Sequence, residues 1–247
     1  MLSVGTSDVE SNPQDSVCSF LTRKERSLIY IQPAHPEPHS RQFPPRMPGS
    51  ASLHAMQERF IADIHKNRNN RAILERWHAL ALPDGWLVAG CLFQTVWNLR
   101  SGSAPEAGIK DYDLFYFDAS DTSDAGESRV QARVDEALGD LGITVEASNQ
   151  ARVHLWYESY FGHPYEPLSS TRDGIDRFLV PATCVGVRPG ELYAPNGLSM
   201  LYDGLLTMNP LMPHRELFDK KAASYCARWP WLQIRPDGLS HAETAPR

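Results

Sequence analysis

Several features that would assign a function directly are missing from the 247-residue sequence. Its four cysteines form no CxxC pair, so neither a zinc ribbon nor a thioredoxin-type redox motif is predicted. The nine histidines include no HExxH motif, which is the usual pattern of a zinc protease. No run of 18 or more apolar residues occurs, and the N-terminus lacks a basic-then-apolar signal pattern. We therefore expect a cytoplasmic protein without a membrane partner.

The sequence also has fewer basic than acidic residues. The chain has 24 Lys and Arg residues against 30 Asp and Glu residues, a formal net charge of −6. Proteins that bind long nucleic acids generally carry a basic field, so this balance argues against a polymerase acting on a long template. The hydrophobic fraction of 42% and the charged fraction of 22% are typical of an ordinary globular protein.

Proline and serine are distributed unevenly and divide the chain into three parts. Residues 1–50 contain SNPQDS, PAHPEPHS and FPPRMPGS, which bury too little apolar surface to offset the entropy of ordering them. We expect a weakly ordered leader over 1–50, a single folded domain over 51–235 and a loose tail over 236–247. The leader supports one alternative function, a protein–protein interaction module.

Within the predicted domain the hydrophobic pattern changes between the periods of helices and strands. Helical spacing predicts two helices over 51–80, broken at KNRNN, and further helices over 91–100, 128–142, 171–179, 197–210 and 214–232. Strands are predicted over 110–118, 143–148, 182–189 and 191–197, and at the start of 152–162. The predicted fold class is α+β, with a small mixed β-sheet and flanking helices.

The predicted strand KDYDLFYFD carries two acidic residues. Asp111 and Asp113 are two residues apart, so their side chains share one face of the strand. Two carboxylates placed together repel each other, and a divalent cation such as Mg²⁺ neutralises both. The apolar residues 114–117 indicate that the strand is buried in a sheet, which places the acids at the rim of that sheet. We interpret the pair as metal ligands.

Two other features fit the same chemistry. Gly90 begins a predicted helix, and the free N–H groups at a helix N-terminus bind phosphate. Glu146, in ITVEAS, lies on the face opposite Ile143 and Val145, and it reaches the aspartates if the two strands pair. A triphosphate would then lie beside three carboxylates.

A bound triphosphate brings about four negative charges and therefore needs cationic partners. Lys110 directly precedes the acids, and Arg152 and His154 are two residues apart, so they share a face if they lie on a strand. Lys220 and Lys221 rank lower, because a solvated helix face accounts for them.

Gly90-Cys91, Asp111-Tyr112-Asp113 and the later acid together resemble the nucleotidyltransferase superfamily that includes DNA polymerase beta. A narrower resemblance, over roughly 73–231, is to a poorly characterised nucleotidyltransferase-like family, on the segments KDYDLFYFD, VEASNQARVHLWYESYFGHPY, DGIDRFLVPATCVGVR and YAPNGL. It implies a minimal sheet of the polymerase beta type with the glycine-turn helix packed on it. It also implies transfer of a nucleoside monophosphate from an NTP to an acceptor, with pyrophosphate leaving.

The resemblance assigns a role to each matching residue. Gly90 would form the phosphate-side turn, with Cys91 after it, and Asp111, Asp113 and Glu146 would be the catalytic carboxylates that bind Mg²⁺ or Mn²⁺. The acceptor could be a small molecule, an RNA end or a protein.

The sequence departs from the superfamily pattern at two points. Cys91 stands where glycine or serine is common, and a thiol is a weak donor to phosphate. The insertion SGSAPEAG also lengthens the stretch between Gly90 and Asp111. Both departures favour an alternative, a catalytically weak or inactive nucleotide sensor on the same fold.

Overall fold

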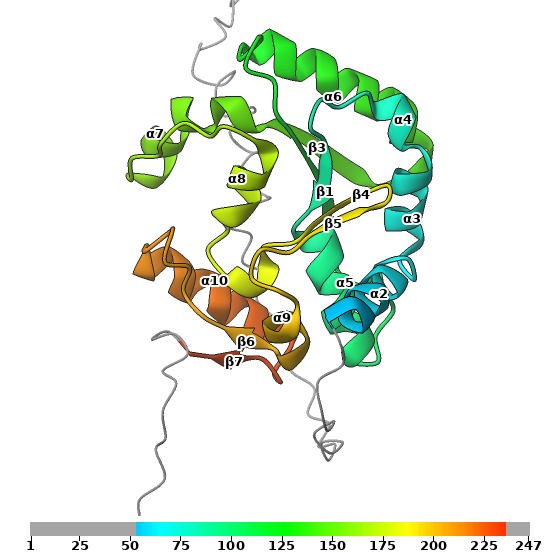
Figure 1. The fold of residues 1–247 in the computed structure, drawn as a ribbon, viewed down its shortest axis with the longest axis vertical. Coiled ribbons are helices and arrows are strands. Elements are labelled where there is room, and N and C mark those ends of the chain that lie inside the picture. The colour runs from blue at the N-terminus through cyan, green and yellow to red at the C-terminus, as the bar shows by residue number, and fades with distance from the viewer. Residues whose placement is uncertain (1–52, 236–247) are drawn as a thin grey trace, which may run out of the picture. The chain divides into compact units, whose positions relative to one another are not determined.

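The structure is a computed structural model that describes residues 53–235. The leader and the tail predicted over 1–50 and 236–247 lie outside the described residues. None of the helices within 53–235 has the length and apolar content needed to cross a bilayer. Figure 1 shows a small sheet flanked by helices. In chain order the elements are α2 (Leu53–Ile64), α3 (Arg68–Glu75), α4 (Trp77–Leu80), β1 (Trp86–Val88), α5 (Gly90–Arg100), β2 (Asp111–Tyr116), α6 (Asp124–Leu138), η1 (Gly139–Leu141), β3 (Thr144–Asn149), η2 (Gln150–Leu155), α7 (Tyr157–Phe161), α8 (Thr171–Asp176), η3 (Pro181–Thr183), β4 (Gly186–Arg188), β5 (Glu191–Tyr193), α9 (Ser199–Asp203), β6 (Leu205–Leu206), α10 (Arg215–Arg228) and β7 (Gln233–Ile234).

The main sheet has five strands in the order β3-β2-β1-β4-β5. β2 and β3 are parallel, and α6 lies between them in the chain, as a parallel pair requires a crossover connection. β1 is antiparallel to both β2 and β4, and β4 pairs with β5 as a hairpin. A separate two-stranded sheet pairs β6 with β7. The predicted α+β class with a small mixed sheet is confirmed.

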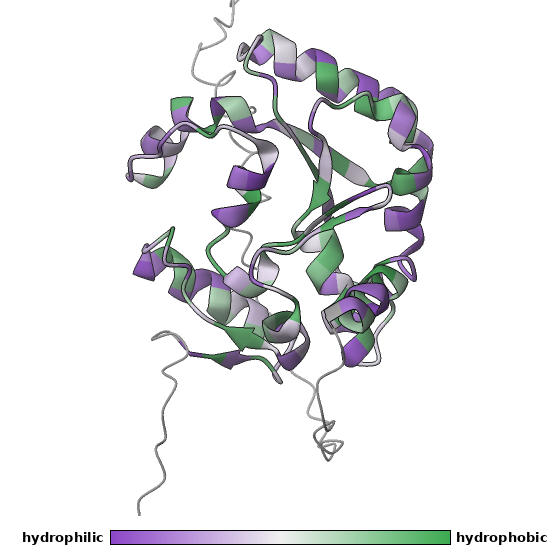
Figure 2. Cartoon of the chain, viewed as in Figure 1, coloured by the Kyte–Doolittle hydropathy of each residue, from purple (hydrophilic) through white to green (hydrophobic). Residues whose placement is uncertain are grey.

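The two faces of this sheet are covered differently. Leu87 and Leu114 point to one face, where they join the main hydrophobic core with residues of α2, α5 and α6. Trp86 and Val88 point to the other face and pack against Ile175 of α8. Figure 2 shows mostly hydrophobic ribbon on α5, whereas α6 alternates between hydrophilic and hydrophobic colours. The aspartates of β2 belong to the second, less apolar face.

Side-chain caps set where two helices begin. Asn67 accepts the N–H groups of Asn69 and Asn70, which begins α3 inside the run where the sequence predicted a break. Ser123 accepts the N–H of Gly126 and begins α6 earlier than the hydrophobic pattern predicted. Polar residues therefore fix these boundaries.

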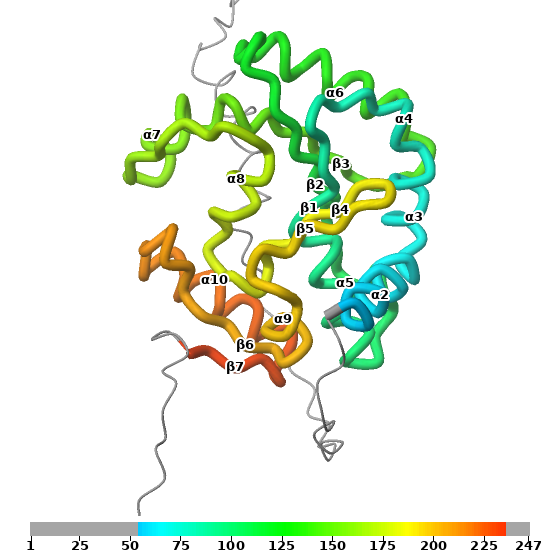
Figure 3. The backbone as a smooth tube through the Cα atoms, in the orientation of Figure 1, coloured from blue at the N-terminus to red at the C-terminus, as the bar shows by residue number. Residues whose placement is uncertain are grey.

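The strand predicted at the start of 152–162 is wrong. The chain there forms the 3₁₀ helix η2 and then α7, a path that Figure 3 follows from β3 to α8. Asn149 ends β3, and its side-chain amide donates to the carbonyl of Asp118, so the chain turns at this point. Arg152 and His154 therefore lie on a helical turn and do not share a strand face.

Two other segments differ from the sequence pattern. The central strand β1 is buried at all three residues, so it has no polar–apolar alternation that would reveal a strand. The helix predicted over 197–210 is reduced to α9, because Gly204, at φ 74°, ends it and the next two residues pair as β6.

Candidate active site

The predicted carboxylates meet at one end of the sheet. In the parallel ladder of β2 and β3, Asp113 pairs with Glu146 and Asp111 pairs with Thr144. Residues in register on parallel strands project to the same face, and adjacent strands lie about 4.8 Å apart. The two strands thus bring Glu146 to the face that carries both aspartates, as the sequence predicted. Asp111, Asp113 and Glu146 are called the carboxylate site below.

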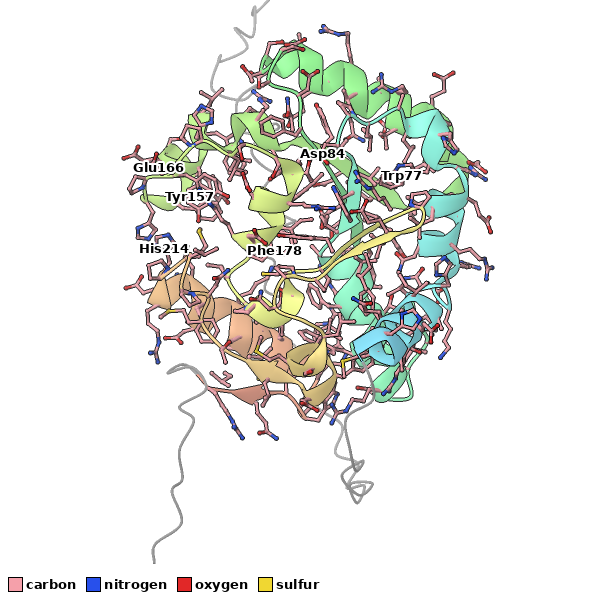
Figure 4. All side chains as sticks on the ribbon, viewed as in Figure 1. Trp77, Asp84, Tyr157, Glu166, Phe178 and His214 are labelled. Carbon is pink, nitrogen blue, oxygen red and sulfur yellow. The ribbon has the colours of Figure 1, made fainter. Side chains whose placement is uncertain are left out.

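The three acids differ in exposure. Asp113 is only 4% exposed, whereas Asp111 and Glu146 are half-buried. The same face becomes apolar two residues beyond Asp113, where Phe115 packs edge-on against Phe178 with ring centroids 5.7 Å apart. Figure 4 labels Phe178. The carboxylate site therefore lies between an apolar wall and the open end of the sheet, where charge interactions are less screened than in water.

The predicted phosphate-side turn lies beside these acids. Val88, the last residue of β1, is paired with Asp113, and α5 begins two residues later at Gly90. The residue between them, Ala89, has φ 58° and ψ −124°, a strained conformation for a residue with a Cβ. Its carbonyl accepts the N–H of Leu92, which closes the first turn of the helix. The backbone N–H groups of Gly90 and Cys91, the first two residues of α5, have no partner within the helix. They follow shortly after the strand residue that is paired with Asp113.

Gly90 is covered by a side chain of its own helix. A methyl group at this position would lie 2.8 Å from Nε2 of Gln94, the movable end of a flexible side chain. Packing alone does not therefore require glycine here. A glycine leaves the backbone approachable to a ligand once the Gln94 amide moves.

Cys91 does not replace the hydroxyl that is common at its position. Its thiol is fully buried and donates to the carbonyl of Val88 at 3.4 Å. Burial raises the pKa of the thiol well above its usual value, and the nearby charges of Asp113 and Asp111 add to this effect. The side chain stays protonated and packed in the core, so Cys91 offers a ligand only its backbone.

Arg152 is paired with α6. Its guanidinium donates to Glu127 and to Asp124, and only 8% of its side chain is exposed. Glu127 also accepts the N–H of Asn149 at the end of β3. These three charged residues are called the α6 ion-pair cluster. Asn149 is three residues beyond Glu146, about 10 Å along β3, so this cluster lies towards the end of the strand that is away from the carboxylate site.

The other two predicted cations are placed differently. Lys110 is exposed and directly precedes β2, next to Asp111. His154 is half-buried on η2, beyond the end of β3, and its Nδ1 is buried without a hydrogen-bond partner in the described part of the chain. Lys110 is thus the only one of the three at the end of the sheet that holds the acids.

Lys221, which the sequence interpretation ranked low, lies at the carboxylate site. It is half-buried on α10. Burial lowers its pKa to about 8, and the charges of Asp113 and Asp111 oppose that shift, so its ammonium is within electrostatic reach of both. The spacing could have indicated this: buried Phe218 and Tyr225 lie at i−3 and i+4 from Lys221, so it borders the inward face of the helix.

α10 is held against α5 by aromatic and polar contacts. The ring of Tyr225 lies 5.3 Å from those of Phe93 and Trp97, measured between centroids. One turn further on, Nη1 of Arg228 donates to Oε1 of Gln94 at 2.7 Å. These contacts place α10 over the beginning of α5.

The donor set suits a divalent metal. Within residues 53–235, no three His, Cys, Asp or Glu side chains are already grouped as a metal cage. The carboxylate site nevertheless offers hard oxygen donors, which Mg²⁺ and Mn²⁺ prefer.

Comparisons with known proteins connect this geometry to a family. A sequence profile of the nucleotidyltransferase family matches residues 75–234, a span that includes β1, β2, β3 and α10. The curated proteins give no significant match. Among solved structures, an NMR structure described as revealing a CCA-adding enzyme head domain matches with a TM-score of 0.56 and 24% identity, over 74% of this chain and 95% of that chain. At that identity the likeness establishes the fold alone. The family match covers every element of the site, and the chain therefore belongs to the nucleotidyltransferase family, whose activity is nucleotidyl transfer.

Proposed function

We propose that this nucleotidyltransferase is a Mg²⁺-dependent enzyme that moves a nucleoside monophosphate from an NTP to an acceptor hydroxyl. The observation that carries the proposal is the pairing of Asp113 with Glu146 on one side and with Val88, at the Gly90 turn, on the other. This arrangement puts oxygen ligands and a helix N-terminus at one end of one sheet face. Mn²⁺ would suit the same ligands.

Each group has a role in phosphoryl transfer, which depends mainly on positioning and charge stabilisation. Asp111 and Asp113 would hold the metal, and the ion would supply Lewis-acid charge beside the phosphates. The N–H groups at the start of α5 would hold the phosphates. Glu146 is on the neighbouring strand, half-buried, and would accept the proton of the attacking hydroxyl or complete the metal site.

Arg152 has no part in this proposal, because both ends of its guanidinium bind carboxylates of α6. Lys110 is kept in the proposal because it directly precedes Asp111 in the chain. His154 lies beyond the far end of β3 and is likewise left out.

The test is pyrophosphate release from each of the four NTPs with Mg²⁺. Three acceptor pools should be supplied separately: small metabolites, RNA with free 3′ ends, and proteins. We expect release in at least one pool, its loss in Asp113→Asn, and its retention in the matched control Asp219→Asn. Asp219 is a half-exposed aspartate of α10 that pairs with Arg215. Equal release by native protein and Asp113→Asn would contradict the proposal.

A nucleotide sensor on the same fold is the second candidate function. It is favoured by the burial of the Cys91 thiol, which removes one donor to the phosphates, and by the 4% exposure of Asp113. Calorimetry distinguishes the two candidates. NTP binding without pyrophosphate release in any acceptor pool would identify a sensor.

A further inference from the structure

Helix α10 presents a mixed face to the beginning of α5 and to the carboxylate site. Lys221, Tyr225 and Arg228 are spaced at i, i+4 and i+7, so they lie along one side of the helix. Tyr225 is buried against the rings of Phe93 and Trp97 of α5. These three residues are called the α10 face.

One end of the α10 face is held near the predicted phosphate turn. At one end, Arg228 donates to Gln94 at 2.7 Å and to the carbonyl of Ala107 at 3.3 Å. The Gln94 amide in turn lies over Gly90. At the other end, the ammonium of Lys221 lies 5.5 Å from the centroid of the Tyr225 ring. The contact with Tyr225 lies within α10, and Arg228 holds that helix beside the start of α5.

The chemistry of an NTP requires cations at this place. Its phosphates bring about four negative charges to a site that already holds three carboxylates. A divalent ion neutralises part of that charge, and an ammonium on the helix side neutralises more. Lysine suits the task because its ammonium is a compact point charge with three donors.

We propose that Lys221 is the phosphate-binding cation of this enzyme, held in place by Tyr225 and Arg228 of the α10 face. The inference rests on the proposed function and adds a residue to it. In the absence of nucleotide the ammonium interacts with the aspartates, and in the complex it contacts the β- and γ-phosphates beside the metal. Lys221 is thus a substrate-binding residue contributed by the last helix of the described chain.

Adjacent Lys220 provides a matched control. It is one residue away on the same helix but is exposed, about 100° around the helix axis from Lys221. Binding of the α,β-methylene analogues of the four NTPs should be measured by calorimetry with Mg²⁺. We expect Lys221→Gln to weaken triphosphate binding by roughly tenfold to a hundredfold, the usual effect of losing a hydrogen bond to a charged group. Lys220→Gln should stay within about twofold of the native protein.

A purely structural role for Lys221 predicts a different pattern. If the lysine only stabilised the aspartates, its loss would weaken nucleoside monophosphate and triphosphate binding equally. As a binder of β- and γ-phosphates, it should affect the triphosphate far more than the monophosphate, and Lys221→Arg should recover part of the affinity. Equal losses for the two ligands, or unchanged triphosphate binding in Lys221→Gln, would overturn the proposal.

A measurement on the native protein avoids the risk that a variant does not fold. An amine-reactive reagent should label Lys221 in the free protein, and the methylene triphosphate with Mg²⁺ should protect it while leaving Lys220 labelled, as read by mass spectrometry. Protection of neither lysine under saturating ligand would overturn the inference.

If Lys221 is protected but no acceptor pool supports pyrophosphate release, the proposed function fails while the Lys221 assignment stands. Full turnover by Lys221→Gln would remove the assignment and leave the proposed function intact.

Discussion

The α6 ion-pair cluster and the carboxylate site contain the same kinds of residue but differ in how their charges are balanced. In the first, Arg152 contacts both Asp124 and Glu127, and one of these carboxylates is also tied to the backbone of β3. In the second, Asp111 and Asp113 of β2 lie beside Glu146 of β3, and the ammonium of Lys221 is within electrostatic reach of the two aspartates. Direct ion pairs hold elements together, whereas carboxylates gathered at the end of a sheet provide the oxygen ligands that a divalent cation prefers. The comparison predicts that substitutions in the first affect stability and substitutions in the second affect catalysis.

The largest effect is expected from Asp113→Asn. Removing a metal ligand should lower the rate of pyrophosphate release by roughly 1,000-fold, since charge stabilisation of the transition state is worth several kcal/mol. The melting temperature should not fall, because the change also removes repulsion between neighbouring carboxylates. Steady-state kinetics and thermal unfolding of the same preparation provide the check. A lowered melting temperature with retained activity would reverse the assignment of the two clusters.

The opposite pattern is expected from Arg152→Met. The substitution leaves Glu127, which is 8% exposed, without its charge partner, and breaking a buried ion pair costs about 3–5 kcal/mol of unfolding free energy. Turnover by the folded fraction should stay close to the native value. Urea unfolding measures the loss. The double variant Arg152→Met, Glu127→Gln serves as control and should regain part of the stability, because no isolated charge remains buried.

A smaller effect, confined to binding, is expected from Gly90→Ala. The new methyl group would meet only the movable amide of Gln94, so the unfolding free energy should change by less than about 1 kcal/mol. Triphosphate affinity should fall by about tenfold, because the methyl group occupies the space that a phosphate approaches. Calorimetry of the single variant and of Gly90→Ala, Gln94→Ala separates the causes. If the second change restores affinity, the displaced amide and not the methyl group is responsible.

The smallest effect concerns a histidine outside both clusters. The ring of His214 stacks on that of His163, with centroids 4.0 Å apart, and Figure 4 shows it at the start of α10. Burial, together with the charge of His163, lowers the pKa of His214 below its usual 6.5. The unfolded chain therefore binds more protons near that pH, so this residue's contribution to stability is present above pH 6.5 and is lost as the pH falls through and below it. Urea unfolding at pH 7.5, 6.0 and 5.0 should show a smaller decline in His214→Gln than in the native protein.

The parts of the fold that follow from local patterns were predictable from the sequence. The alternation in β2 and β3 identified both strands, and the two-residue spacing placed the aspartates on one face. Their register with Glu146 depends on a parallel pairing through α6, which no local pattern specifies. The sequence did not predict β1, because a strand that is buried on both faces shows no alternation of polar and apolar residues.

The positions of the basic residues were also not predictable from local sequence patterns. Arg152 and His154 were assigned to a strand because the segment is rich in β-favouring residues, but Asn149 ends the strand before them. Lys221 lies far along the chain from the acids, and only the packing of α10 on α5 brings it to them. Helical spacing shows that it borders a buried face, but not which strand that face meets.

The position of α10 late in the chain has a consequence for the newly made protein. The segment that becomes β2 leaves the ribosome well before residues 215–228, since translation adds about 5 to 20 residues per second. Until that helix emerges and docks, the nascent polypeptide holds these acids without Lys221 beside them. A product that stopped short of Arg215 would keep the carboxylates of β2 and β3 and lose Lys221, so on our proposal it would bind triphosphates more weakly than the full chain.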